Sequence, residues 1–190
     1  MLNCQMKKPT VFIILFLCLH LYSGALTGIY STSNGTVTFH SEAPQELISA
    51  TSNTLHGLID IEKRTFAFRV RVRTFKGFNS GLQEQHFNEN YLESEKFPEI
   101  TFRGKIIEQV DFSVDGKYIV RTKGLLSIHG VEQERIIKSE VKVQNGIIYV
   151  TSRFNVLITD HDIKVPRVVH EKIASEIKVE VAADFKKKGD

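Results

Sequence analysis

The stretch His86-Phe-Asn-Glu-Asn-Tyr-Leu-Glu-Ser-Glu-Lys-Phe-Pro-Glu-Ile-Thr-Phe102 is the clearest interruption in a chain whose apolar and polar residues otherwise alternate. Tyr91 and Leu92 follow Phe87 by four and five positions, so the three side chains can share the inward face of a helix. Pro98 has no backbone N–H and disfavours helical geometry in the residue before it. The stretch therefore predicts a helix that ends before Pro98 and a strand that begins near Glu99.

The start of this helix is indicated by Ser80-Gly-Leu-Gln83. A serine can accept a hydrogen bond at a helix N-terminus, and a glutamine three residues later has the spacing of a capping box. We expect the helix to begin at Ser80, to end near Ser94 and to lie across one mouth of the fold.

Alternation on both sides of this helix predicts antiparallel β-structure. Phe66, Phe68 and Val70 fall on one face of a strand, whereas Arg69 and Arg71 fall on the other. The arginine face, which continues to Arg73, is interpreted as a solvated outer surface.

The same pattern recurs in residues 118–128, where Tyr118, Leu126 and Ile128 share the inward face. Asn145-Gly146 readily adopts the positive φ angles of a two-residue turn, so it predicts a hairpin. Strands are expected at residues 35–41, 47–53, 55–61, 66–72, 99–106, 118–128, 140–143, 147–156 and 176–185, some of which can merge. We expect a mostly β, single-domain antiparallel barrel of about eight strands, since closure removes exposed edges.

Residues 1–25 have the composition of a secretory signal peptide. Lys7 and Lys8 precede an almost entirely apolar run at residues 11–21, and Ser23-Gly-Ala25 offers small residues for cleavage after Ala25. The apolar run is too short to cross a hydrocarbon core of ~30 Å as a helix. We therefore expect a periplasmic or secreted protein with no permanent membrane anchor.

Cleavage would remove Cys4 and Cys18, the only two cysteines, so the mature fold would have no disulfide. It would also remove Lys7 and Lys8, leaving 23 basic against 22 acidic residues and a formal charge of +1 in place of +3. Near neutrality argues against nucleic acid as a partner. Residues 26–185 should form one domain, and residues 186–190 should be a disordered basic tail.

Periodicity alone leaves open whether the barrel is filled by its own side chains or holds a slender apolar ligand. Each methylene of such a ligand would contribute about 0.8 kcal/mol on leaving water. The candidate ligand-binding residues of the channel wall or mouth are Phe66, Phe68, Val70, Phe87, Tyr91, Phe97, Phe102, Tyr118, Leu126, Ile128, His86 and Asn90.

Asp160-His161-Asp162, with His170 further on, contains residue types that bind zinc or act as an acid and base pair. In an extended strand, however, the two aspartates would face one way and His161 the other. We therefore expect no metal, no cofactor and no catalytic residue, and an enzyme that acts on an amphiphile through this region is the weakest of the functional hypotheses.

Three segments together resemble the YceI-like family of bacterial secreted proteins. They are residues 86–102, the sequence Gly124-Leu-Leu-Ser-Ile-His-Gly-Val131, and the sequence Phe154-Asn-Val-Leu-Ile-Thr-Asp160 followed by Ile163 and Pro166. The resemblance covers residues 28–185. It departs from the family pattern at Ser127 and Glu132, where the family usually has threonine.

This resemblance implies an elongated lipocalin-like barrel whose apolar channel holds an isoprenoid or another long-chain amphiphile. The expected function is therefore non-enzymatic binding or carriage of such a ligand. The alternative is an interaction or stress-related periplasmic protein with a self-filled barrel, no physiological lipid and an outer basic stripe that recruits a partner. Whether two copies associate as a homodimer is left open by the sequence.

Overall fold

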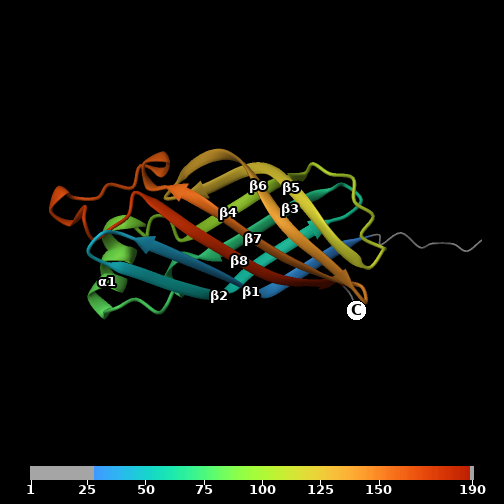
Figure 1. Cartoon of the computed structure of the whole chain (residues 1–190), viewed down its shortest axis with the longest axis horizontal. Coiled ribbons are helices and arrows are strands. Elements are labelled where there is room, and N and C mark those ends of the chain that lie inside the picture. The colour runs from blue at the N-terminus through green and yellow to red at the C-terminus, as the bar shows by residue number, and fades with distance from the viewer. Residues whose placement is uncertain (1–27, 189–190) are drawn as a thin grey trace, which may run out of the picture.

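The computed structural model describes residues 28–188, which form an elongated, closed barrel of eight antiparallel strands in sequence order (Figure 1). The strands are β1 (Ile29–Glu42), β2 (Leu47–Asp60), β3 (Thr65–Arg71), β4 (Glu99–Ile106), β5 (Gly116–Ile128), β6 (Val131–Gln144), β7 (Ile147–Leu157) and β8 (Glu176–Lys187). The helical segments are η1 (Val72–Thr74), α1 (Gly81–His86), η2 (Phe87–Tyr91), η3 (Ile158–His161) and η4 (Arg167–Val169). The predicted fold class is confirmed. The predicted signal peptide lies outside the described residues.

The two strands expected at residues 47–53 and 55–61 are one strand, β2, with a bulge between them. Gly35 pairs with Leu55 but Val37 pairs with Ser52, so β2 has one residue more than β1 at this point. The extra residue changes which side chains of β2 point inward: even-numbered positions up to Ser52 and odd-numbered positions from Leu55 onward. Both Ser52 and Leu55 are buried. The bulge makes one strand look like two in the sequence.

Strand β6 is much longer than the predicted residues 140–143. Its first half has polar side chains on both faces, and Ile136 points outward, so alternation is hidden there. The turn that follows is confirmed, because Asn145 and Gly146 have φ angles of 51° and 75° between the paired residues Gln144 and Ile147.

The predicted helix is confirmed in part. The Ser80 hydroxyl accepts a hydrogen bond from the Gln83 N–H at 3.2 Å, and the Gln83 side chain accepts one from the Asn79 N–H. After His86 the helix widens into the π-helical turn η2, in which the Leu92 N–H donates to the Phe87 carbonyl. Across the described residues, no helix combines the length and the apolar character that crossing a membrane requires.

The predicted disordered tail is wrong for its first residues. Lys186 and Lys187 belong to β8 and pair with Ser31 and Tyr30 of β1, and the Lys188 N–H donates to the Ile29 carbonyl at 2.8 Å. Closing the barrel requires backbone partners for the start of β1, and the lysine side chains can still point into solvent. Residues 189–190 lie outside the described part.

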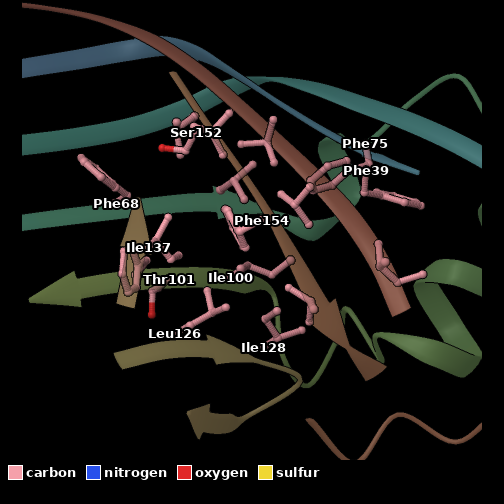
Figure 2. A pocket seen from close by; sticks show the side chains of 18 of the residues that line it. Phe39, Phe68, Phe75, Ile100, Thr101, Leu126, Ile128, Ile137, Ser152 and Phe154 are labelled. Carbon is pink, nitrogen blue, oxygen red and sulfur yellow. The ribbon is translucent and has the colours of Figure 1, made fainter. Parts of the chain in front are cut away.

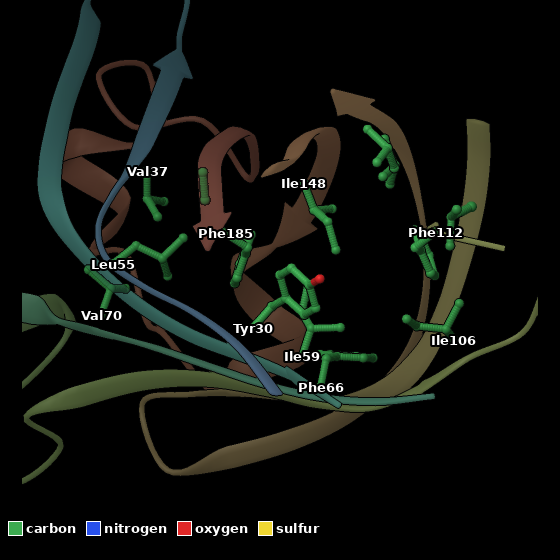
Figure 3. Packing of buried hydrophobic residues seen from close by; sticks show 14 of the residues in the cluster. Tyr30, Val37, Leu55, Ile59, Phe66, Val70, Ile106, Phe112, Ile148 and Phe185 are labelled. Carbon is green, nitrogen blue, oxygen red and sulfur yellow. The ribbon is translucent and has the colours of Figure 1, made fainter. Parts of the chain in front are cut away.

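The barrel has a filled end and an end that carries α1. The filled end lies near the C-terminus, where Tyr30, Ile59, Phe66, Ile148 and Phe185 converge on the axis (Figure 3). The opposite end carries α1, the β1–β2 hairpin and the connection between β7 and β8 (Figure 1). Long connections therefore gather at the end where the core is less complete.

Strands β6 and β7 separate towards the α1 end, since their pairing runs only from Ser139 to Gln144 on β6. The gap is bridged by η3. His161 of this turn is fully buried, and its Nδ1 donates to the Val131 carbonyl at 3.1 Å. Its Nε2 has no hydrogen-bond partner among residues 28–188. Burial lowers the pKa of His161, and the bond to Val131 offsets part of this effect.

A lowered pKa makes His161 a source of acid sensitivity. The neutral ring stabilises the fold above its unfolded-state pKa of about 6.5, and this contribution is lost as pH falls towards the lower folded-state pKa. We expect the unfolding free energy to decrease between about pH 7 and pH 5, by at most about 1.4 kcal/mol per pH unit from this group. In His161→Asn, whose amide can replace the Nδ1 donor but does not titrate, urea denaturation should show a weaker decrease. His56→Asn, at an exposed position, is the control. If the unfolding free energy fell equally with pH in the unaltered protein and in both variants, this account would be contradicted.

Gly104 and Gly124 face each other across β4 and β5. A Cβ atom added to Gly104 would lie 2.1 Å from the Lys123 carbonyl oxygen, whereas one added to Gly81 would meet nothing within 4 Å. The two strands therefore approach more closely than side chains allow.

Substitution of these glycines should have opposite effects. Gly104→Ala forces backbone apart and should lower the unfolding free energy by about 1–3 kcal/mol. Gly81→Ala, at an open helical position, should raise it by about 0.5–1 kcal/mol. Chemical denaturation measures both changes. If Gly104→Ala left the unfolding free energy unchanged, the close approach of β4 and β5 would not require glycine at this position.

Candidate ligand-binding cavity

A cavity of about 570 Å³ occupies the barrel interior between α1 and the filled end, whose residues Ile59, Phe66, Ile148 and Phe185 also line it (Figure 2). Small-molecule sites in proteins usually measure roughly 300–1,000 Å³. Every strand contributes apolar side chains to the wall, because one face of each strand points inward. Phe68, Leu126 and Phe154, for example, reach it from β3, β5 and β7.

Nine of the twelve residues predicted from the sequence lie on this cavity. They are Phe66, Phe68, Val70, Phe87, Tyr91, Phe102, Leu126, Ile128 and His86. Their positions follow from strand alternation and from the inward face of the helix. That any of them contacts a ligand stays a prediction.

Phe97, Tyr118 and Asn90 do not line the cavity. Phe97 packs edge-on against His129, with ring centroids 4.8 Å apart, and so fastens the segment after η2 to the β5–β6 turn. Tyr118 donates its hydroxyl to the Val114 carbonyl at 2.7 Å and belongs to the filled end. Asn90 is exposed on the outer side of η2. Periodicity gave the correct face for Tyr118 but not its depth along the barrel.

Three phenylalanines that sequence reasoning did not assign to the site form its lid with Phe87. Phe39 stacks on Phe87, with ring centroids 5.2 Å apart and an interplanar angle of 14°. Phe75 and Phe78 pack against Phe87 at 5.9 and 5.1 Å. Alternation in residues 35–41 was a signal for Phe39. Phe75 and Phe78 lie in a connection without periodicity, so no comparable signal marked them.

Several of the few polar groups of the wall bond to one another or to backbone. Ser139 and Ser152, which are both buried, share a hydrogen bond of 2.6 Å between their hydroxyls. Thr122 donates to the Ile137 carbonyl, and Ser41 accepts from the Ala174 N–H. A buried water needs two to four free polar partners. These pairings leave little for water to bind, so the cavity is suited to an apolar occupant.

The mouth is assembled from segments that are distant in sequence. The β1–β2 hairpin is held on one side by α1, where the Gln83 amide donates to the Glu46 carboxylate. On the other side, the Gln45 N–H donates to the Glu171 carbonyl at 2.8 Å. Glu46, His86 and Lys172, which belong to these segments, therefore lie at the rim of the cavity.

The Asp160, His161 and Asp162 group lies in a turn and not on an extended strand. Residues Ile158–His161 form the 3₁₀ turn η3, and Asp162 adopts a left-handed φ of 54°. Asp160 pairs with Arg135 at 3.7 Å, and the Nε2 atom of His170 bonds to the Val165 carbonyl. Within residues 28–188, no three His, Cys, Asp or Glu side chains are arranged to hold a metal ion.

Several solved structures share this fold. A polyisoprenoid-binding domain from Saccharophagus degradans implicated in plant cell wall breakdown matches with a TM-score of 0.71 and 12% identity, over 85% of this chain and 99% of that chain. Burkholderia cenocepacia BcnA matches with a TM-score of 0.66 and 13% identity, over 79% and 95%. The Campylobacter jejuni YCEI protein matches with a TM-score of 0.50 and 16% identity, over 96% and 100%. At such identities the likeness shows the fold alone.

Sequence comparison gives a more direct assignment. No curated protein matches the chain. The family model for the YceI-like domain, in contrast, matches residues 12–185, which include the barrel from the start of β1 to Phe185 of β8. The protein therefore belongs to the YceI-like family.

Proposed function

We propose that this protein binds a long-chain apolar ligand, an isoprenoid or another lipid-like amphiphile, inside its barrel and carries it without covalent chemistry. The observation that carries the proposal is the cavity, whose wall is mostly apolar and whose buried Ser139 and Ser152 hydroxyls bond to each other. The polyisoprenoid-binding domain with the same fold supports the same ligand class. The expected signal peptide supports a site of action outside the cytoplasm.

The volume of the cavity sets the length of chain that it can enclose. If a methylene takes about the 30 Å³ that a water molecule occupies in the liquid, the cavity holds on the order of fifteen to twenty carbons. Each buried methylene contributes about 0.8 kcal/mol, so a chain of this length can bind tightly without polar recognition. A longer ligand would extend past the phenylalanine lid into the mouth.

The position of the titratable groups supports binding over catalysis. Glu46, His86 and Lys172 lie at the rim, and the Glu46 carboxylate is held by the Gln83 amide. An enclosed chain would therefore meet hydrocarbon along most of its length. A reaction on it would have to take place at the mouth.

The competing function, recruitment of a partner through the outer arginine stripe of a self-filled barrel, has less support. Arg69 pairs with Glu99 at 3.2 Å, and Arg73 pairs with Glu95. Arg71 shares Glu99 with Arg69, so two carboxylates offset most of the charge of the stripe, and the barrel interior holds a cavity and is not filled by side chains throughout.

A chain-length series tests the proposed function. Prenols of about ten, fifteen, twenty and forty carbons should bind with affinities that rise steeply, by up to about 0.8 kcal/mol per enclosed methylene, and then level off near twenty carbons. Competition with an environment-sensitive apolar dye would measure the affinities.

One variant locates the ligand inside the barrel. Val150 follows Ile148 on the inward face of β7, and both residues line the cavity, so Val150→Phe fills space next to the filled end and raises the floor. It should move the plateau to a shorter chain. The control, Val114→Phe, adds the same side chain at an exposed loop position and should change nothing. Affinities that do not depend on chain length, or a plateau that Val150→Phe leaves in place, would reject binding in the cavity.

A further inference from the structure

Exposed aliphatic side chains gather around the mouth of the cavity. Val168 of η4 and Leu47 at the start of β2 are 87% and 70% exposed, the highest values among the large hydrophobic residues of the described chain. Leu82 of α1 is 60% exposed. Scattered exposed leucines need no explanation, but these three come from separate segments that surround one opening. Leu82 itself and Val169, the neighbour of Val168, line the cavity.

Hydrogen bonds hold these segments together. The Asn79 amide donates to the Leu47 carbonyl at 2.9 Å, which fastens the start of α1 to β2. The Gln45 N–H donates to the Glu171 carbonyl, which fastens the β7–β8 connection to the same hairpin. We call Leu47, Leu82 and Val168 the apolar rim. Its members are presented by a prearranged surface at the end of the molecule where the β7–β8 connection projects beyond the strands (Figure 1).

The β7–β8 connection adds positive charge beside the apolar rim. Lys164, Arg167 and Lys172 are exposed, and none of them forms an ion pair or side-chain hydrogen bond with another described residue. Glu171, the one acid of residues 164–172, has its carboxylate bonded to the Gln45 amide. These three free cations form a charge pattern that suits anionic phosphate groups.

Acidic residues on the α1 side of the mouth do not cancel this pattern. Glu84 pairs with Lys76, and Glu95 pairs with Arg73. Glu46 and Glu171 bond to neutral amides and keep their charge, but the three free cations of the β7–β8 connection outnumber these two carboxylates.

Exposed aliphatic residues elsewhere on the barrel lie in a different setting. Ile136, 60% exposed on β6, is paired across the sheet with Lys123, and Ile119, 52% exposed on β5, is paired with Glu140. Each is isolated in a ladder of charged side chains. Neither of them lines the cavity.

We propose that the α1 end of the barrel docks on the surface of an anionic lipid bilayer. The apolar rim enters the headgroup layer, and Lys164, Arg167 and Lys172 contact lipid phosphates. The cavity then opens onto the bilayer, so an apolar chain can pass between the two without crossing water. This docking rests on the proposed function, because it gives the ligand its source and destination.

Vesicle binding tests the docking surface. The mature protein should sediment with vesicles of phosphatidylglycerol and phosphatidylcholine and only weakly with phosphatidylcholine alone, and salt should weaken the binding. Each basic residue near an anionic surface strengthens binding about fivefold, so Lys164→Glu with Arg167→Glu should reduce it by more than about tenfold. Val168→Asp should also reduce it by about tenfold or more, because a charge replaces an inserting side chain.

Matched changes on the barrel wall serve as controls. Ile136→Asp places the same charge at a position as exposed as Leu82, and Lys138→Glu reverses an exposed lysine of β6 that forms no ion pair within the described chain. Both should bind vesicles like the unaltered protein. Equal losses of vesicle binding in the rim variants and the wall variants would overturn the proposal. So would a failure of the unaltered protein to sediment with anionic vesicles, which is the result expected if the rim contacts a protein.

Prenol affinity, measured without vesicles, separates docking from ligand binding. Val168→Asp should keep the affinity of the unaltered protein and lose only vesicle binding and the rate of prenol transfer from vesicles. Unaltered prenol binding with no vesicle binding in any protein would overturn docking and leave the proposed function standing. Vesicle binding that depends on Val168, with no prenol binding, would support docking and reject the proposed function.

Discussion

The ladder of backbone hydrogen bonds between β1 and β8 turns an eight-stranded sheet into a tube with an enclosed interior. Closure removes the sheet edges, and it also fixes a width that side chains must either fill or leave open. Near the C-terminus, Tyr30, Phe66 and Phe185 reach the axis and fill it. Further along, the inward positions hold smaller residues such as Val150 and Ser152, so the opposite walls do not meet.

The open half depends on segments that lie outside the regular ladder. Phe87 reaches the lid from a π-helical turn, and Phe39 stacks on it from β1. The seam between β6 and β7 is closed by η3, where buried His161 bonds to the Val131 carbonyl. The strands thus form the apolar wall of the cavity, whereas the connecting segments form its mouth and contribute the charged side chains there.

Much of this architecture follows from local sequence. Alternation predicted the inward faces, Pro98 the start of β4, and Asn145-Gly146 the hairpin, because each depends on neighbouring residues alone. The bulge in β2 and the filling of the barrel could not be predicted in this way. Whether inward side chains meet depends on residues from other strands at the same depth, as Tyr118 shows by its place in the filled end. Phe75 and Phe78 lie in an irregular connection, so only the tertiary structure reveals their contact with the lid.

The central claim is that the interior of this barrel encloses an apolar chain. It is tested most directly by a high-resolution crystal structure of the protein purified from its own host without added lipid, together with mass spectrometry of the organic extract. The account predicts elongated, continuous density from the floor at Ile148 and Phe185 to the Phe39 and Phe87 lid, with an extracted lipid of matching length. Discrete waters hydrogen-bonded inside the cavity, or walls that collapse until the aromatic rings fill it, would contradict the claim.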